Sequence, residues 1–202
     1  ECSRTAAALA LKYGCTPRSV GKEHIHELQQ KLLKNDCFIP GFVNEDEEDL
    51  ARHAVVSASS ETENGKAQNV INGISRSVGD ETNCWISGSL ETPQMLTLKL
   101  PQANTVCQVR LTFDTDLSHE IQPSMIRNVR DRQVKGLPHE LVKTYCVRLM
   151  LDGAVVAAKE ISKNGQRLNI LNFDDIRCDE VQITVKATHG CNEARIFEVR
   201  VY

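Results

Sequence analysis

The chain has 202 residues, a formal net charge of −3, 41% hydrophobic residues and 25% charged residues. A length of this order corresponds to one large domain, or to one domain with an appendage. The composition excludes the disordered, collagenous and coiled-coil classes, and no apolar run approaches the roughly 20 residues that span a bilayer. A mildly acidic chain with 4% aromatic residues also lacks the basic surface of a nucleic-acid-binding protein.

The sequence pattern of residues 1 to about 36 predicts helices. The stretch Ala6–Leu11 contains strong helix formers, and Gly14 is placed to end the first helix because glycine accepts a left-handed backbone. Thr16 and Pro17 predict the cap and the first residue of a second helix. An amphipathic stripe follows, which we expect to pack against a domain outside this sequence. Its members are Ile25, Leu28 and Leu32.

A boundary follows the helical segment. The tripeptide Ile39-Pro40-Gly41 and the acidic run Glu45–Asp49 fit neither a helix nor a strand pattern. We therefore predict a helical segment at residues 1–37, a linker at 38–53 and a separate domain at 54–202.

After residue 54 the apolar pattern changes to that of short strands. In Val181–Val185 apolar and polar side chains alternate, as in a half-buried antiparallel strand. Asp152-Gly153 is a strong two-residue hairpin signal, and Leu137–Lys143 predicts a helical turn. About eight short strands joined by long loops predict a β-sandwich or jelly roll. The other predicted strands are Met95–Leu100, Val106–Phe113, Tyr145–Leu151 and Ile196–Tyr202.

The eight cysteines include no CxxC pair, so the sequence suggests neither a zinc ribbon nor a thioredoxin-like site. The even number permits disulfides, but the spacing is irregular and a chain this long can build a core without them. Cys107 and Cys146 lie in apolar, strand-like runs where a buried thiol acts as a small hydrophobic group. We favour reduced cysteines.

Several short motifs, taken in order, resemble the discoidin or coagulation-factor type C family. They run from Val56–Ser60 through Asn69–Gly73, Cys84–Ser87 and Gln94–Leu98 to the closing stretch Ala194–Tyr202. The resemblance covers about residues 54–202. It implies a galactose-binding-like jelly-roll β-sandwich, which in this family is a non-catalytic module for glycans, lipids or proteins.

The same resemblance implies a structural Ca²⁺ site formed by Asn72, Asn83 and Glu198. Amide and carboxylate oxygens suit Ca²⁺, but the family usually has Asp where this sequence has Asn72, which leaves one carboxylate. The alternative is that Asn72-Gly73 is simply a turn and Glu198 a paired carboxylate. On the last strand we expect Phe197, Val199 and Val201 to share one face, with Glu198 on the other.

The helical start is similar to the C-terminal end of the flavin domain in a family of bacterial FAD-dependent oxidoreductases. The similarity rests on Ala6–Arg18 and Leu28–Leu33. It implies that this chain is the C-terminal part of a longer enzyme whose FAD lies in an upstream domain, and it favours a periplasmic or secreted location. The chain itself lacks the glycine-rich fingerprint that binds a dinucleotide, since Gly14 and Gly21 do not supply it.

Two residues are candidates for ligand binding. Trp85 can stack on a sugar ring, although the family pattern makes this position a core residue. Arg76 follows the Asn72-Gly73 turn and can donate hydrogen bonds to ligand oxygens. It can equally be an ordinary exposed loop arginine.

Two charged clusters could serve a function, and each also has a simple interpretation as a solvated surface. His24 and His26 lie about 200° apart on a helix and cannot share one metal ion, which favours a solvated polar face. A basic cluster can dock an acidic surface, including Glu45–Asp49 of the same chain, or be a solvated loop. Its members are Arg127, Arg130, Arg132 and Lys135.

The sequence thus predicts a non-catalytic C-terminal module of a larger FAD-dependent oxidoreductase. Its role is docking against its own upstream flavin domain or binding a partner. The alternative is a carbohydrate-binding module that brings an attached enzyme to glycans. The low aromatic content favours docking, because sugar-binding surfaces use aromatic rings. Neither nucleic acid nor a membrane span is expected.

Overall fold

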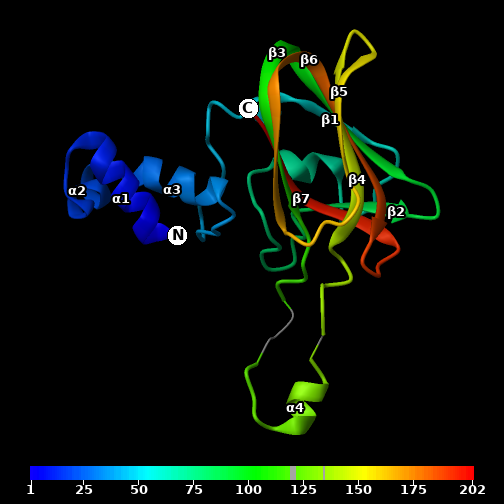
Figure 1. The fold of residues 1–202 in the computed structure, drawn as a ribbon, viewed down its shortest axis with the longest axis horizontal. Helices are drawn as coiled ribbons and strands as arrows, with labels where there is room; N and C mark the ends of the chain where they lie inside the picture. Colours follow the sequence, from blue (N-terminus) through cyan, green and yellow to red (C-terminus); the bar gives the residue numbers. More distant parts are fainter. Residues whose placement is uncertain (119–121, 134) are drawn as a thin grey trace.

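The structure, a computed structural model, describes residues 1–118, 122–133 and 135–202. A unit of three helices lies to one side of a β-sandwich, and a segment carrying the short helix α4 (Arg127–Asp131) projects from one end of the sandwich (Figure 1). Among the described residues, no helix is long and apolar enough to cross a membrane.

The helical unit comprises α1 (Cys2–Tyr13), α2 (Pro17–Glu23) and α3 (Ile25–Lys34). Gly14 ends α1 in the left-handed conformation, with φ of 61°, and the Thr16 hydroxyl caps α2 by accepting a hydrogen bond from the Ser19 amide at 3.2 Å. The three helices enclose a small apolar core of their own. Its buried members are Leu9, Ala10, Val20, Leu28 and Leu32.

This core corrects the expectation for the amphipathic stripe. Leu28 and Leu32 pack between the helices, and only Ile25, which is 44% exposed, faces solvent. The stripe therefore closes a three-helix unit, because two of its three side chains already have apolar neighbours within the chain.

The sandwich confirms the predicted fold. Its strands are β1 (Val55–Ala58), β2 (Trp85–Ser89), β3 (Gln94–Phe113), β4 (Val142–Leu151), β5 (Ala154–Ile161), β6 (Leu168–Thr188) and β7 (Glu193–Val201). All pairs are antiparallel, in the order β2-β7-β3-β6-β4-β5, and β1 pairs with β3. Two 3₁₀ turns, η1 (Leu50–His53) and η2 (Ala67–Ile71), lie between the helices and β1 and between β1 and β2.

Two long strands join the layers. The first half of β3 pairs with β1 and the end of β6, and its second half pairs with β7 and the start of β6. The predicted strands Met95–Leu100 and Val106–Phe113 are thus one 20-residue strand with a register shift after Lys99. One apolar core fills the space between the layers, including Trp85, Leu96, Phe113, Tyr145 and Ile183.

Turns and bulges follow the local sequence. Asp152 and Gly153 take φ values of 51° and 79° and form the predicted hairpin between β4 and β5. The predicted helical turn near Leu137–Lys143 is a single turn, in which the Leu141 amide donates to the Pro138 carbonyl at 3.2 Å. The expectation that Cys107 is buried is wrong: a register shift between Val106 and Gln108 leaves the residue exposed. Cys146 is buried as expected.

The linker lies along the outer face of β3 and β7. That face carries buried polar side chains, and the linker and the end of the helical unit supply their partners. Arg110 Nη2 donates to Asn35 Oδ1 at 3.2 Å, and Arg200 Nη1 donates to Asn44 Oδ1 at 3.0 Å. The Val201 amide donates to Asp49 Oδ1 at 2.9 Å. These contacts attach the helical unit to the sandwich through hydrogen bonds and charges.

Candidate functional site

A polar pocket opens at the end of the sandwich from which the α4 segment projects. It has a volume of about 280 Å³. Three parts of the chain that are far apart in sequence meet there: the loop after η2, the residues that follow β3, and the first half of β7. The pocket is lined by Arg76, Ser77, Asp114, Asp116, Leu117, Ser118, Arg195 and Phe197.

Arg195 and Asp114 form the charged wall of this pocket. Arg195 Nη1 lies 3.4 Å from Asp114 Oδ2, and its Nε donates to Glu193 Oε1 at 2.9 Å. Burial works against the charge on Arg195, but the hydrogen bond and the charge of Glu193 outweigh it and raise the pKa of the guanidinium. The guanidinium is therefore charged at neutral pH, and it faces the Asp114 carboxylate beside the opening.

Arg76 also lines the pocket. Its guanidinium lies 4.7 Å from the centre of the Phe38 ring, a residue of the linker. Within the part of the chain that the structure describes, Arg76 has no carboxylate partner and its Nε has no hydrogen-bond acceptor. A held but uncompensated guanidinium beside a pocket can donate to ligand oxygens.

Phe197, a buried residue of β7, lines the pocket because of a bulge in that strand. The register between β3 and β7 shifts after the Thr112–Glu198 pair. As a result Ile196, Val199 and Val201 belong to the sandwich core, whereas Phe197 lines the pocket. The expectation that Phe197 shares a face with Val199 and Val201 is wrong for this reason.

The two asparagines predicted for a cation lie together beside Arg76. Asn72 Nδ2 donates to Asn83 Oδ1 at 3.0 Å, and Asn72 Oδ1 accepts from the Ile74 amide at 2.9 Å. Asn83 Nδ2 in turn donates to the Arg76 carbonyl at 3.3 Å. Both side-chain oxygens are thus already hydrogen-bonded, and the pair braces the loop that carries Arg76.

Glu198, the third predicted ligand, lies on the linker-covered face. It is 4% exposed, and its Oε2 lies 2.9 Å from Arg200 Nε. Burial raises the pKa of Glu198, and the charge of Arg200 opposes that shift. With two amide oxygens in use and the carboxylate paired to a guanidinium, the three residues do not fit a Ca²⁺ ion in this arrangement. The described residues also contain no cluster of three His, Cys, Asp or Glu side chains suited to a metal.

Trp85 lies inside the core. Its side chain is fully buried and its Nε1 donates to the Ser60 carbonyl at 2.9 Å. The indole face therefore packs against protein and is not open to a sugar. Gly14 ends α1 and Gly21 lies within α2, so neither follows a strand as a dinucleotide fingerprint requires, and these residues do not fit FAD.

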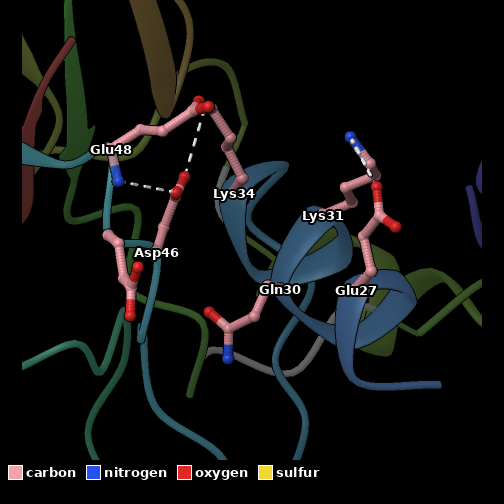
Figure 2. A pocket seen from close by; sticks show the side chains of 7 residues that line it. Glu27, Gln30, Lys31, Lys34, Asp46 and Glu48 are labelled. Carbon is pink, nitrogen blue, oxygen red and sulfur yellow. Dashed lines mark hydrogen bonds and ion pairs between the residues drawn. The ribbon is translucent and has the colours of Figure 1, made fainter. Parts of the chain in front are cut away.

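A second groove, of about 210 Å³, lies between α3 and the linker (Figure 2). Both lysines that line it are paired: Lys34 Nζ lies 3.3 Å from Asp46 Oδ2, and Lys31 Nζ lies 3.7 Å from Glu27 Oε1. The lining also includes Glu47 and Glu48, so the groove is acidic overall. The acidic run thus meets α3. The basic cluster lies elsewhere, on and after α4, where Arg127 pairs with Asp131 at 3.5 Å.

The remaining polar residues singled out in the sequence serve local contacts. His24 stacks on Tyr13 with ring centres 3.9 Å apart, and His26 Nε2 lies 2.9 Å from Glu45 Oε2. The eight cysteines, all among the described residues, form no disulfide with one another. A further shallow pocket of about 340 Å³ is lined by Thr62, Ser87, Gly88, Ser89, Cys191, Asn192 and Glu193.

No family model and no curated protein matches the chain. Solved structures do match. The lectin domain of lectinolysin, complexed with Lewis B antigen, superposes with a TM-score of 0.57 at 18% identity, covering 77% of this chain and 96% of that domain. The family 32 carbohydrate-binding module of Clostridium perfringens NanJ, complexed with galactose, gives 0.53 at 20% identity, covering 76% and 96%.

Chitosan-binding module 1 from the chitosanase/glucanase of Paenibacillus sp. IK-5 gives a TM-score of 0.57 at 16% identity, covering 76% of this chain and 97% of the module. This chain has the galactose-binding-like fold. At such identities the likeness is one of fold, and about a quarter of this chain lies outside the match.

Sequence reasoning found one lining residue of the pocket, Arg76. It missed Asp114 and Arg195, because the segment after β3 and the start of β7 meet only in the fold, and it placed Phe197 on the wrong face. Asp114 and Arg195 are separated by 81 positions. No local motif links them, so their pairing has no signal in the sequence.

Proposed function

We propose that the sandwich is a carbohydrate-binding module and that the pocket around Arg76, Asp114, Arg195 and Phe197 takes a sugar. The fold supports this, since solved neighbours are carbohydrate-binding modules. The donor set supports it as well: guanidinium groups donate to sugar oxygens, and a carboxylate accepts from sugar hydroxyls.

The observation that carries the proposal is the state of Arg76. Its guanidinium rests on Phe38, lacks a carboxylate partner among the described residues, and lines the same pocket as Asp114 and Arg195. A volume of about 280 Å³ is near the lower end of ligand pockets, which run from roughly 300 to 1,000 Å³. It suits one terminal sugar residue of a glycan. At about 0.3 kcal/mol per ligand atom, we expect dissociation constants on the order of 1 mM.

Calorimetry tests the proposal with galactose, fucose and a chitosan oligosaccharide as probes. We expect saturable binding of at least one sugar, and a loss of about tenfold or more on Arg76→Ala, because one charge-assisted hydrogen bond is worth about 1.5–3 kcal/mol. Arg177→Ala is the matched control, since Arg177 is an exposed arginine of β6 away from the pocket. Equal losses in both variants, or no binding of any probe by the unaltered chain, would contradict the proposal.

A second candidate function is docking within a larger protein, with a flavin domain upstream. The observation that favours it is the buried polar contact between the linker and the outer face of β3 and β7, which gives the sandwich a fixed place relative to the helical unit. The complete reading frame tests it. A strand, a glycine-rich turn and a helix upstream, together with FAD in the purified full-length protein, would support it. A different upstream domain would reject it.

A further inference from the structure

The linker between the helices and the sandwich also touches the walls of the pocket. Two residues where the helical segment meets the linker are involved: Asp36, just before the linker, and Phe38, its first residue. Asp36 follows α3 and takes a left-handed backbone, with φ of 60°, which Asp tolerates better than most residues. Phe38 lies against Arg76, with ring centre and guanidinium carbon 4.7 Å apart.

Asp36 holds Arg167 through a bidentate ion pair. Arg167 Nε donates to Asp36 Oδ2 at 2.7 Å, and Nη2 donates to Oδ1 at 3.4 Å. The two side chains are only 12% and 15% exposed. A guanidinium this buried needs a carboxylate in place, because an unpaired charge there would be strongly unfavourable.

The same guanidinium ties the three segments that form the pocket. Its Nη1 donates to the carbonyl of Phe113, the residue before Asp114, at 2.7 Å. Its Nη2 donates to the carbonyl of Ser75, the residue before Arg76. Its carbon lies 5.1 Å from the ring centre of Phe197. Asp114, Arg76 and Phe197 all line the pocket.

We infer that Asp36 and Phe38 are positioning residues of the pocket: Asp36 fixes Arg167, which fixes the backbone on either side, and Phe38 fixes Arg76 directly. The helical unit is thereby coupled to ligand binding through its linker. That the occupant is a sugar rests on the proposed function, whereas the positioning itself concerns only this chain's own residues.

A merely structural role would have the Asp36–Arg167 pair hold the helices to the sandwich and nothing more. The chain offers a matched control for that alternative. Asp46 is a carboxylate within the linker, whose side chain is 17% exposed and binds Lys34 and the Tyr202 hydroxyl, away from the pocket. Asp36→Asn and Asp46→Asn each weaken the attachment of the linker, but only Asp36→Asn removes support from the pocket.

Hydrogen exchange without any sugar is the first measurement. The amides of Ile74, Val78 and Phe113 are hydrogen-bonded within the segments that Arg167 ties. We expect Asp36→Asn to accelerate their exchange about tenfold or more relative to the amide of Ile183, a buried residue of β6, and Asp46→Asn to leave them within about twofold. Equal acceleration in both variants, or none in Asp36→Asn, would overturn the inference.

Two further arms keep the test decisive. If Asp36→Asn does not fold, Phe38→Leu removes only the stacking on Arg76 and is expected to accelerate Ile74 and Val78 but not Phe113. Unchanged exchange at Ile74 and Val78 would then overturn the inference. In the second arm, the probe sugar that binds the unaltered chain is titrated into Asp36→Asn, with an expected loss of about tenfold. If galactose, fucose and the chitosan oligosaccharide all fail to bind the unaltered chain, the proposed function fails, and hydrogen exchange alone decides the positioning role.

Discussion

The helical unit and the sandwich are held together by different kinds of contact. The sandwich has one continuous apolar core between two layers, whereas the core of the helical unit has five buried apolar members, with Leu33 of α3 buried outside it. The joint between them is mainly polar, with contacts such as Asp36–Arg167 and Asn35–Arg110. A small core stabilises little, and hydrogen bonds to charged groups are strict in geometry. From this difference we expect the helices to be less stable than the sandwich, while polar contacts fix where they sit.

Cavity-forming substitutions in the two cores test this comparison with the largest expected change in the free energy of unfolding. Leu96 is fully buried in the sandwich core and Leu32 is 8% exposed in the helical core. We expect Leu96→Ala to lower the free energy of unfolding of the sandwich by about 3 kcal/mol. Leu32→Ala should loosen the helices and leave the sandwich transition nearly unchanged. Urea unfolding followed by the fluorescence of Trp85, the only tryptophan, reports the sandwich, and far-ultraviolet circular dichroism adds the helices. Equal shifts of the Trp85 transition in both variants would argue against the comparison.

The buried polar face of the sandwich provides the next test. We expect Glu198→Gln to lower the free energy of unfolding by about 3 kcal/mol, because it leaves the Arg200 guanidinium buried without its carboxylate. Glu160→Gln removes an exposed partner of Lys186 and should have a much smaller effect. Neither EDTA nor added millimolar Ca²⁺ should move the melting temperature. A Ca²⁺-dependent rise in melting temperature that Glu198→Gln abolishes would instead identify a cation site.

Acidification should separate the two regions. The Tyr13 and Lys12 hydrogen bonds lower the pKa of Glu27. Burial opposes ionisation of Asp46, but its contacts with Tyr202 and Lys34 outweigh burial and lower its pKa. A lowered folded-state pKa gives stability that is present above the unfolded value and is lost as pH falls through the folded value. Burial raises the pKa of Asp49 and Glu198, so their contribution has the opposite sign.

We therefore expect the helical circular-dichroism signal at 222 nm to weaken below about pH 4.5, before the Trp85 fluorescence changes. Each partly exposed ion pair should contribute less than about 1 kcal/mol to the stability that is lost. Loss of both signals at one pH would mean that the two regions open as a unit. Glu27→Gln should shift the helical transition, and Glu160→Gln serves as the control for an exposed carboxylate outside the helices.

Thiol reactivity, which compares exposed cysteines with buried ones, is the test with the smallest expected effect. Cys2 of the helical unit and Cys107 of the sandwich are exposed. Burial raises the pKa of Cys84 to about 12 and that of Cys178 to about 11, which leaves almost no reactive thiolate near neutral pH. A disulfide reagent should modify Cys2 and Cys107 quickly and reach Cys84 and Cys178 only after unfolding. Fast native modification of Cys84 would mean that the core opens easily.

Local patterns predicted much of the fold. The helix end at Gly14, the cap at Thr16 and the hairpin at Asp152-Gly153 all follow from backbone preferences of single residues, and the structure confirms them. Such signals act over a few positions and need no knowledge of the rest of the fold. The type of fold followed from the number and pattern of short strands.

Features that depend on register could not be predicted. The bulge that turns Phe197 into the pocket, and the one that exposes Cys107, both change the pairing register of a strand. A period-of-two pattern cannot reveal where such a change occurs. The pocket itself joins Arg76, Asp114 and Arg195, which meet only when the sandwich closes. Asp36–Arg167 spans 131 positions and has no local signal either.

The central claim is that this sandwich binds a sugar in the pocket around Arg76, and chemical-shift mapping tests it most directly. The ¹⁵N-labelled chain would be titrated with galactose, fucose and a chitosan oligosaccharide. The account predicts saturable shifts confined to residues 74–78, 114–118 and 194–197, and their loss in Arg76→Ala but not in Arg177→Ala. Saturable shifts centred on the other pocket, at Thr62 and Ser87, or no saturable shift with any of the three sugars, would contradict it.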